Sequence, residues 1–163
     1  MDKTTNKTAG PLTMAPFPVV SPTPEIALPV QAGLDQPFLA GSYPTAAGPV
    51  PQVESRWVRR DWWGAVKVRS GIHRMNYAID PGLYALGTPD EESPVLASAN
   101  YKLSFDILRR SLPDRSAWIL VLDTKGINVW CAAGKGTFGT DELVRQIEAS
   151  GLKEVGGHRK VII

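Results

Sequence analysis

The most apolar run of the chain is Trp118-Ile119-Leu120-Val121-Leu122, which lies between the polar residues Ser116 and Asp123. A short, continuously apolar run with such boundaries predicts a β-strand buried on both faces of a parallel sheet. Open α/β folds bind ligands where such strands end, at the carboxyl edge of the sheet. We therefore expect the residues after Asp123 to carry the function.

The stretch Asn128-Val129-Trp130-Cys131-Ala132-Ala133-Gly134-Lys135 follows that strand and holds the only cysteine of the chain. We predict a short helix from about Ile127 to Lys135, with Trp130, Cys131 and Gly134 on one face. A glycine one turn beyond the thiol leaves that face bare, so the helix could lie against a flat ligand and present sulfur to its centre. A free cysteine is also commonly a small buried hydrophobic residue, and the spacing alone leaves both interpretations open.

Two other kinds of site can be weighed at the same residues. Gly134-Lys135-Gly136-Thr137 is similar to part of a phosphate-binding P-loop, but that motif needs Ser or Thr directly after the lysine. It also needs a glycine where this chain has Val129, so we exclude it. A nucleophilic cysteine would need a base, and the only histidines, His73 and His158, lie in no recognisable motif.

Residues 128–135 resemble the cap-helix motif of the HgcA family of mercury-methylating corrinoid proteins, with eight consecutive matching residues that include the rare Trp-Cys pair. Residues 94–106, Pro-Val-Leu-Ala-Ser-Ala-Asn-Tyr-Lys-Leu-Ser-Phe-Asp, are similar to the large subunit of the corrinoid iron–sulfur protein of acetyl-CoA metabolism, a relative of that family. The resemblance covers residues 57–163 and leaves the first fifty out. It implies a corrinoid-dependent methyltransferase that transfers a methyl group to Hg(II) and forms methylmercury.

The resemblance also implies the cofactor and the partners. Cobalamin or a related corrinoid would bind in its base-off form between the carboxyl edge and the cap helix, with the Cys131 thiolate as the lower axial ligand of cobalt. A thiolate is a soft, strongly donating ligand, which favours transfer of a methyl group to a soft acceptor. The methyl donor would be a corrinoid or folate methyltransferase pathway. The reductant would be a ferredoxin-like [4Fe–4S] partner, since one cysteine cannot hold such a cluster.

The residues expected at the corrinoid come from three segments. The cap helix supplies Asn128, Val129, Trp130, Cys131, Ala132, Ala133, Gly134 and Lys135, and its flanking loops supply Thr124, Gly126, Thr137, Phe138 and Gly139. Ser98 and Asn100 end the preceding strand at the same edge. Gly156, Gly157 and His158 precede the last strand and are expected to approach the macrocycle or its tail. Other interpretations of four of these residues stay open. Asn128 could be an ordinary helix cap and Trp130 a core anchor, and Lys135 and His158 could be solvated residues without a role in binding.

Around this site the sequence predicts a Rossmann-like, mainly parallel α/β sheet with flanking helices and a cap helix. Val95–Ala99 forms a strand, and Asn100 caps a helix that Pro113 ends. Together with the strand at 117–122 these elements make a β-α-β unit. A helix that Thr140 caps and Gly151 closes follows, and residues 160–163 form a last strand.

The earlier part of the chain gives weaker patterns. Val66-Lys67-Val68-Arg69 alternates and predicts an edge strand, and residues 77–86 predict a hairpin about Asp80-Pro81-Gly82. Residues 1–52 are predicted to be a disordered Pro-rich arm, and 53–163 the corrinoid-binding domain. Residues 1–51 hold ten of the fourteen prolines, only five charged residues and no sustained periodicity.

Three function hypotheses remain from the sequence: a mercury methyltransferase domain, a corrinoid methyl carrier of one-carbon metabolism, and a non-catalytic α/β domain with a buried cysteine. A formal charge of +2 argues against nucleic acid as a partner. Neither a signal peptide nor a transmembrane stretch is recognisable. The family's membrane helices follow its corrinoid domain, so we expect a soluble, cytoplasmic fragment of a protein at the cytoplasmic face of the inner membrane.

Overall fold

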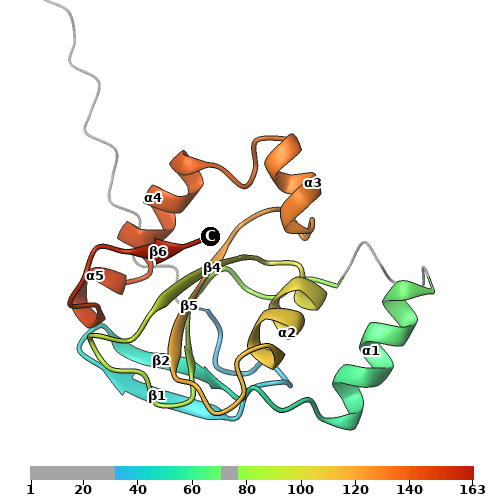
Figure 1. The fold of residues 1–163 in the computed structure, drawn as a ribbon, viewed down its shortest axis with the longest axis horizontal. Coiled ribbons are helices and arrows are strands. Elements are labelled where there is room, and N and C mark those ends of the chain that lie inside the picture. The colour runs from blue at the N-terminus through green and yellow to red at the C-terminus, as the bar shows by residue number, and fades with distance from the viewer. Residues whose placement is uncertain (1–31, 71–76) are drawn as a thin grey trace, which may run out of the picture.

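The apolar run at 118–122 lies in the middle of a sheet in the computed structural model, which describes residues 32–70 and 77–163 (Figure 1). Within that part of the chain the sheet has six strands in the order β1-β2-β3-β5-β4-β6. The strands are β1 (Gly41–Thr45), β2 (Gly48–Val53), β3 (Gly82–Leu86), β4 (Val95–Ala99), β5 (Ala117–Leu122) and β6 (Val161–Ile162). The helices are α1 (Arg59–Arg69), α2 (Lys102–Arg110), α3 (Val129–Gly134), α4 (Thr140–Ala149) and α5 (Leu152–Val155). No helix of the described residues is long and apolar enough to cross a membrane.

Strand β5 is buried along its whole length, as the sequence predicts. Successive residues of a strand point to opposite faces of the sheet. The odd-numbered residues of 117–121 accordingly pack with Phe105 of α2 on one face. The even-numbered residues of 118–122 pack on the other face with Ile147 of α4 and Leu152 of α5. The domain therefore has three layers, with α2 on one side of the sheet and α4 and α5 on the other (Figure 1).

The sheet is mixed, so the expectation of a mainly parallel, Rossmann-like sheet is met only in part. Strand β4 runs parallel to β5 and β6, and β2 runs parallel to β3, but the pairs β1–β2 and β3–β5 are antiparallel. Parallel neighbours need a crossover of about a dozen residues or more. Only residues 87–94 join β3 to β4, so β4 runs opposite to β3. Strand β5 lies between them and is parallel to β4, and it is therefore antiparallel to β3. The α/β class is confirmed, and the Rossmann-like topology is not.

The predicted β-α-β unit is present and brings two strand ends together. Ala99 of β4 lies beside Leu122 of β5 in the parallel register, so both strands end at the same edge of the sheet. Helix α3 follows β5 at that edge, above the ends of the two strands (Figure 1). There Val129 packs with Ala99 and Tyr101. The fold thus presents α3 at the carboxyl edge.

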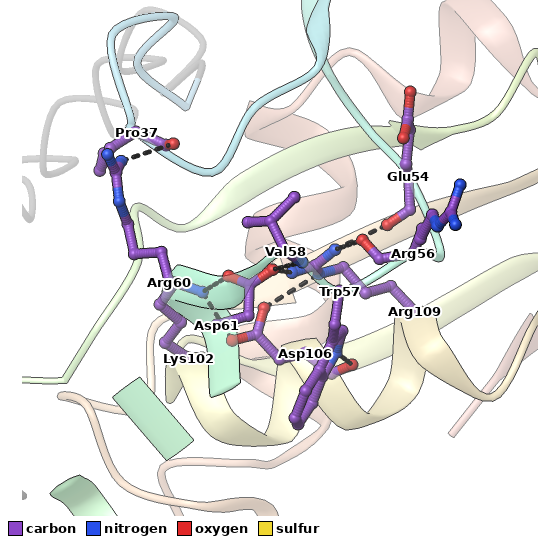
Figure 2. A network of polar contacts seen from close by, with 10 residues as sticks. All are labelled: Pro37, Glu54, Arg56, Trp57, Val58, Arg60, Asp61, Lys102, Asp106 and Arg109. Carbon is purple, nitrogen blue, oxygen red and sulfur yellow. Dashed lines mark hydrogen bonds and ion pairs between the residues drawn. The ribbon is translucent and has the colours of Figure 1, made fainter. Parts of the chain in front are cut away.

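A buried cluster of charged residues joins α1 to α2 (Figure 2). The guanidinium of Arg109 donates to Asp61 Oδ2 at 2.7 Å and to Asp106 Oδ1 at 2.9 Å. Lys102 Nζ lies 2.6 Å from Asp106 Oδ2 and 3.4 Å from Asp61 Oδ1. Arg109 also donates to the carbonyl of Glu54 at 2.7 Å, so its charge and its hydrogen-bond donors are satisfied on several sides. The cluster carries two positive and two negative charges and holds α1 against the body of the domain.

The boundary of the Pro-rich arm is wrong, because residues 41–53 form β1 and β2 of the sheet. Proline cannot donate a ladder hydrogen bond and is confined to edge positions of a sheet. Strand β1 is such an edge, and β2 meets β3 only through Gln52 and Val53, so the prolines of the hairpin cost the sheet few hydrogen bonds. Residues 1–31 lie outside the described residues, and their predicted disorder stays a prediction.

Two predicted elements before β4 are also corrected. Residues 66–69 end helix α1 instead of forming a strand, and Asp61 accepts a hydrogen bond from Val58 N at its start. The buried residues Asp61, Ala65 and Val68 follow helical spacing, which four alternating residues could not reveal. Residues 77–86 do not form a hairpin. Strand β3 is present, but Ala78 bridges to Tyr101.

Candidate functional site

The loop from Asp123 to Ile127 carries the chain from β5 into α3. It contains two successive residues with left-handed backbone conformation, Lys125 at φ 58° and Gly126 at φ 70°. Glycine adopts this conformation freely, whereas lysine does so at a cost of about 1 kcal/mol or more. Such a conformation persists where the surroundings hold it in place.

Asn100 supplies that support from the end of the neighbouring strand. Its side-chain oxygen accepts hydrogen bonds from Thr124 N at 3.1 Å, Thr124 Oγ1 at 2.8 Å and Gly126 N at 2.9 Å. Its side-chain nitrogen lies 3.4 Å from Asp123 Oδ1. The expected role of Asn100 as a helix cap is wrong, since Tyr101 occupies the N-cap position of α2.

Helix α3 forms within two residues of its predicted bounds, and Asn128 is its N-cap. Asn128 Oδ1 accepts from Cys131 N at 2.9 Å, which satisfies one of the free N–H groups at the start of the helix. Thr137 N donates to Ala132 O at 3.0 Å and closes the other end. The cap role of Asn128 is therefore confirmed.

The two sides of α3 differ sharply. Ala132 is fully buried, and Val129 packs into the apolar cluster beneath the helix. On the opposite side Cys131 is exposed, and 89% of the surface of Trp130 is exposed. A Cβ placed on Gly134 would meet no atom within 4 Å. The interpretations of Cys131 as a buried hydrophobic residue and of Trp130 as a core anchor are therefore wrong, and the outer face is bare, as the sequence predicts.

The remaining predicted residues of this edge have different surroundings. Thr124 is buried beneath the loop, and Phe138 packs with Val129 under α3. Ser98 is buried in β4, where its hydroxyl donates to Ala99 O at 3.4 Å. The others lie along the loops and the exposed side of α3, and they are Gly126, Ala133, Lys135 and Gly139.

Gly156, Gly157 and His158 lie at the opposite edge of the sheet, so their expected approach to the site is corrected. Strand β6 runs parallel to β4 and starts beside Val95, the first residue of β4. Residues that precede β6 therefore lie at the amino edge. His158 Nε2 contacts Ser93 O at 3.1 Å, and Gly157 N donates to Glu91 O at 2.7 Å.

A polar hollow of about 510 Å³, which no sequence pattern predicted, lies beside α3. Burial raises the pKa of Asp123, but hydrogen bonds and charge from Lys125 outweigh it and hold that pKa below its usual value. Burial likewise opposes the ionisation of Glu142, while hydrogen bonds from Arg145 and from Asp123 N lower its pKa overall. Glu142 Oε1 accepts from Asp123 N at 2.9 Å, which ties the loop before α3 to helix α4.

Trp130, Cys131 and Gly134 belong to none of the hydrophobic clusters of the described residues, so this side of α3 is open to a ligand. A thiol, an exposed indole and a glycine with open space share one face. Among residues 32–70 and 77–163, no group of three or more His, Cys, Asp or Glu side chains could hold a metal ion. Cys131 is the residue that could ligate the metal of a bound cofactor, and Trp130 and Gly134 border it.

We expect Gly134→Ala to stabilise the ligand-free protein by up to about 1 kcal/mol, since alanine favours a helix over glycine and the added Cβ meets nothing. If the corrinoid that the resemblance implies binds against this face, Gly134→Leu would fill the face and weaken cobalamin binding about 10-fold, as overpacking by 1–3 kcal/mol implies. Thermal unfolding and a spectral titration with cobalamin measure the two effects. Glu148→Leu, an exposed change on α4, is the control, and equal binding by both leucine variants would contradict a role for Gly134.

Comparison with known proteins gives one family. The sequence profile of the family described as CdhD, CO dehydrogenase/acetyl-CoA synthase delta subunit, matches residues 69–163, more than half of the chain. The matched segment contains α2, α3, α4 and the strands from β3 to β6. It leaves out β1, β2 and nearly all of α1.

Individual relatives match a stretch of similar length. The acetyl-CoA decarbonylase/synthase complex subunit gamma of Methanopyrus kandleri is 34% identical over 87 residues, which are 52% of this chain and 19% of that protein. The same subunit of Methanocaldococcus jannaschii is 33% identical over 92 residues, 55% of this chain and 19% of that protein. Subunit gamma 2 of Methanosarcina thermophila is 37% identical over 94 residues, 55% of this chain and 20% of that protein. The chain thus spans about a fifth of the length of these relatives. The resemblance to proteins of acetyl-CoA metabolism is confirmed, while the finer assignment to the HgcA family stays a prediction.

Proposed function

We propose, from the premise that this chain belongs to the CO dehydrogenase/acetyl-CoA synthase delta subunit family, that it binds a corrinoid against the exposed face of α3 and serves corrinoid-dependent methyl transfer. The observation that carries the proposal is the exposed thiol of Cys131 on a bare helix face at the carboxyl edge of the sheet. A soluble α/β domain gains nothing from an indole and a thiol in water, so a bound partner is the simplest reason for both.

Each residue of the outer face has a task in this proposal. Cys131 would lose its proton and ligate cobalt as a thiolate, because a metal binds the deprotonated sulfur. Asn128 fixes the first turn of α3 through its bond to Cys131 N and so holds the sulfur in place. Trp130 would cover the sulfur and keep water from it. When bound, the corrinoid supplies a cobalt–carbon bond whose methyl group can be transferred, and the chain supplies its position and axial ligand.

Two acceptors for the methyl group are supported by different observations. The names of the relatives favour an acceptor in acetyl-CoA metabolism, for which this chain would be the methyl carrier. The comparisons support such an acceptor better than Hg(II). The exposed cysteine favours Hg(II), since an electron-donating thiolate that held the corrinoid's metal would suit methyl transfer to a soft metal ion. In either role we propose an iron–sulfur protein as the electron donor and a separate methyltransferase as the source of the methyl group.

The visible spectrum of the protein loaded with cobalamin tests this proposal. We expect the wild type to bind cobalamin in the base-off form, with a spectrum that Cys131→Ala changes and Glu148→Gln, an exposed change on α4, does not. Failure of the wild type to bind cobalamin would contradict the proposal as a whole. If Cys131→Ala leaves the base-off spectrum unchanged, Cys131 is not a cobalt ligand. That result would favour a role as a methyl carrier of one-carbon metabolism.

A further inference from the structure

We infer that Asn100 is a positioning residue for Cys131. It fixes the position of the Cys131 sulfur through the loop at 123–127, without contact with the cofactor. The inference rests on the proposed function and concerns the same site. Asn100 is 94% buried, so its side chain faces the loop rather than the exposed face of α3. Its backbone is fixed as well, because Asn100 N donates to Leu122 O at 3.0 Å and Ile79 N donates to Asn100 O at 2.9 Å.

The hydrogen bonds of Asn100 form a continuous path to α3. Its Oδ1 gathers three donors from Thr124 and Gly126, on both sides of the left-handed residue Lys125. The two backbone donors fix which end of the amide is oxygen, since a nitrogen there would face N–H groups. The hydroxyl of Thr124 lies 2.7 Å from Ile127 O, and Asn128, the next residue, caps the turn that carries Cys131.

This arrangement lets the exposed face of α3 stay open to a ligand while the helix itself is held in place from elsewhere. The exposed face of α3 must stay free of protein contacts to receive a ligand, so it cannot itself hold the helix still. The loop is held from below instead, by a residue of the adjacent strand end. Ligands of a metal depend on such outer partners for their orientation, and loss of a partner typically costs 10–100-fold in affinity.

Asn100→Leu keeps the approximate volume of the side chain but leaves the buried N–H of Thr124 and the partly buried N–H of Gly126 without their acceptor. We expect it to lower the affinity for cobalamin about 10-fold and to give the loaded protein a spectrum like that of Cys131→Ala. Asn100→Asp keeps the three accepted hydrogen bonds and is expected to restore most of the wild-type spectrum. Its added charge beside Asp123 would make this rescue better at low pH than at high pH.

Alkylation of Cys131 by iodoacetamide in the cofactor-free protein gives a second readout, and circular dichroism checks that each variant is folded. We expect Asn100→Leu to change the alkylation rate by roughly several-fold, because the start of α3 would open locally more easily. If Asn100→Leu does not fold, Thr124→Val takes its place, since it removes only the hydroxyl link. A folded variant with the spectrum and alkylation rate of the wild type would overturn the inference. If Cys131→Ala does not alter the spectrum of the loaded protein, the proposed role of Cys131 as a cobalt ligand is wrong. The alkylation rate then tests the role of Asn100 independently of that proposal.

Discussion

Arg109→Ala is expected to destabilise the protein by about 3–5 kcal/mol, a large share of the stability of a small domain. Arg109 is 2% exposed, and its partners Asp61 and Asp106 are 3% and 1% exposed. Removing the arginine leaves two buried carboxylates with Lys102 as their remaining charged partner. It also leaves the carbonyl of Glu54 without its donor. Chemical denaturation of the ligand-free protein measures the loss.

Arg110→Ala is the matched control for this prediction. Arg110 is the next residue of α2, but it is exposed and lies 4.8 Å from the ring centroids of both Trp57 and Trp62. Exposed cation–π contacts contribute about 0.5–1 kcal/mol, so its removal is expected to cost no more than that. Equal losses of unfolding free energy in the two variants would show that Arg109 in the buried cluster stabilises the protein no more than an exposed arginine does.

The pH dependence gives the same prediction an independent check. Burial raises the pKa of Asp61, but hydrogen bonds from Arg109 and Val58 N, with the charges of Arg109 and Lys102, lower it overall from the usual 3.8. The folded state therefore binds fewer protons at Asp61 than the unfolded state does. This contribution is fully present above pH 3.8 and disappears as the pH falls through the lower pKa of the folded state. The difference between wild type and Arg109→Ala is accordingly expected to shrink in acid.

The elements that the sequence predicted well are those with a local cause. Strand β5 is an uninterrupted apolar run, and α3 has a cap residue at its start, so both follow from adjacent residues. The buried pair Asp61–Arg109 joins residues 48 positions apart. An arginine on a helix otherwise predicts solvent exposure, so nothing in the sequence near Arg109 indicated its burial.

The candidate site shows the same division. Helical spacing alone predicted that Trp130, Cys131 and Gly134 share one face of α3, but it left open whether that face is exposed or buried. Asn100 was expected at the correct edge but with the wrong role, since its partners in the loop lie 24 and 26 residues away. The misplacement of Gly156 to His158 had an avoidable cause. Residues that precede a parallel strand lie at its amino edge, and ligands of such sheets bind at the carboxyl edge.

Cys131→Ala is expected to slow methyl transfer to Hg(II) by about 100-fold, if Hg(II) is the acceptor. Loss of a residue that only orients a metal ligand already costs 10–100-fold, and this change removes the ligand itself. With a methylcorrinoid bound, Cys131 would donate electron density to its metal, and the cofactor would supply a methyl group that is transferred together with its bonding electron pair. A single transfer therefore consumes no reductant, and the protein can be tested without an electron donor.

Protein loaded with methylcobalamin before Hg(II) is added provides the measurement, with methylmercury determined by mass spectrometry. Loading must come first, because the exposed thiol of the cofactor-free protein would itself bind Hg(II). Free methylcobalamin is the blank, and Glu148→Gln, an exposed change on α4 that leaves the sulfur in place, is the control. A wild-type rate no higher than the blank would exclude Hg(II) as the acceptor and leave the one-carbon carrier. A wild-type rate well above the blank that Cys131→Ala retains would show that the transfer does not depend on the thiolate.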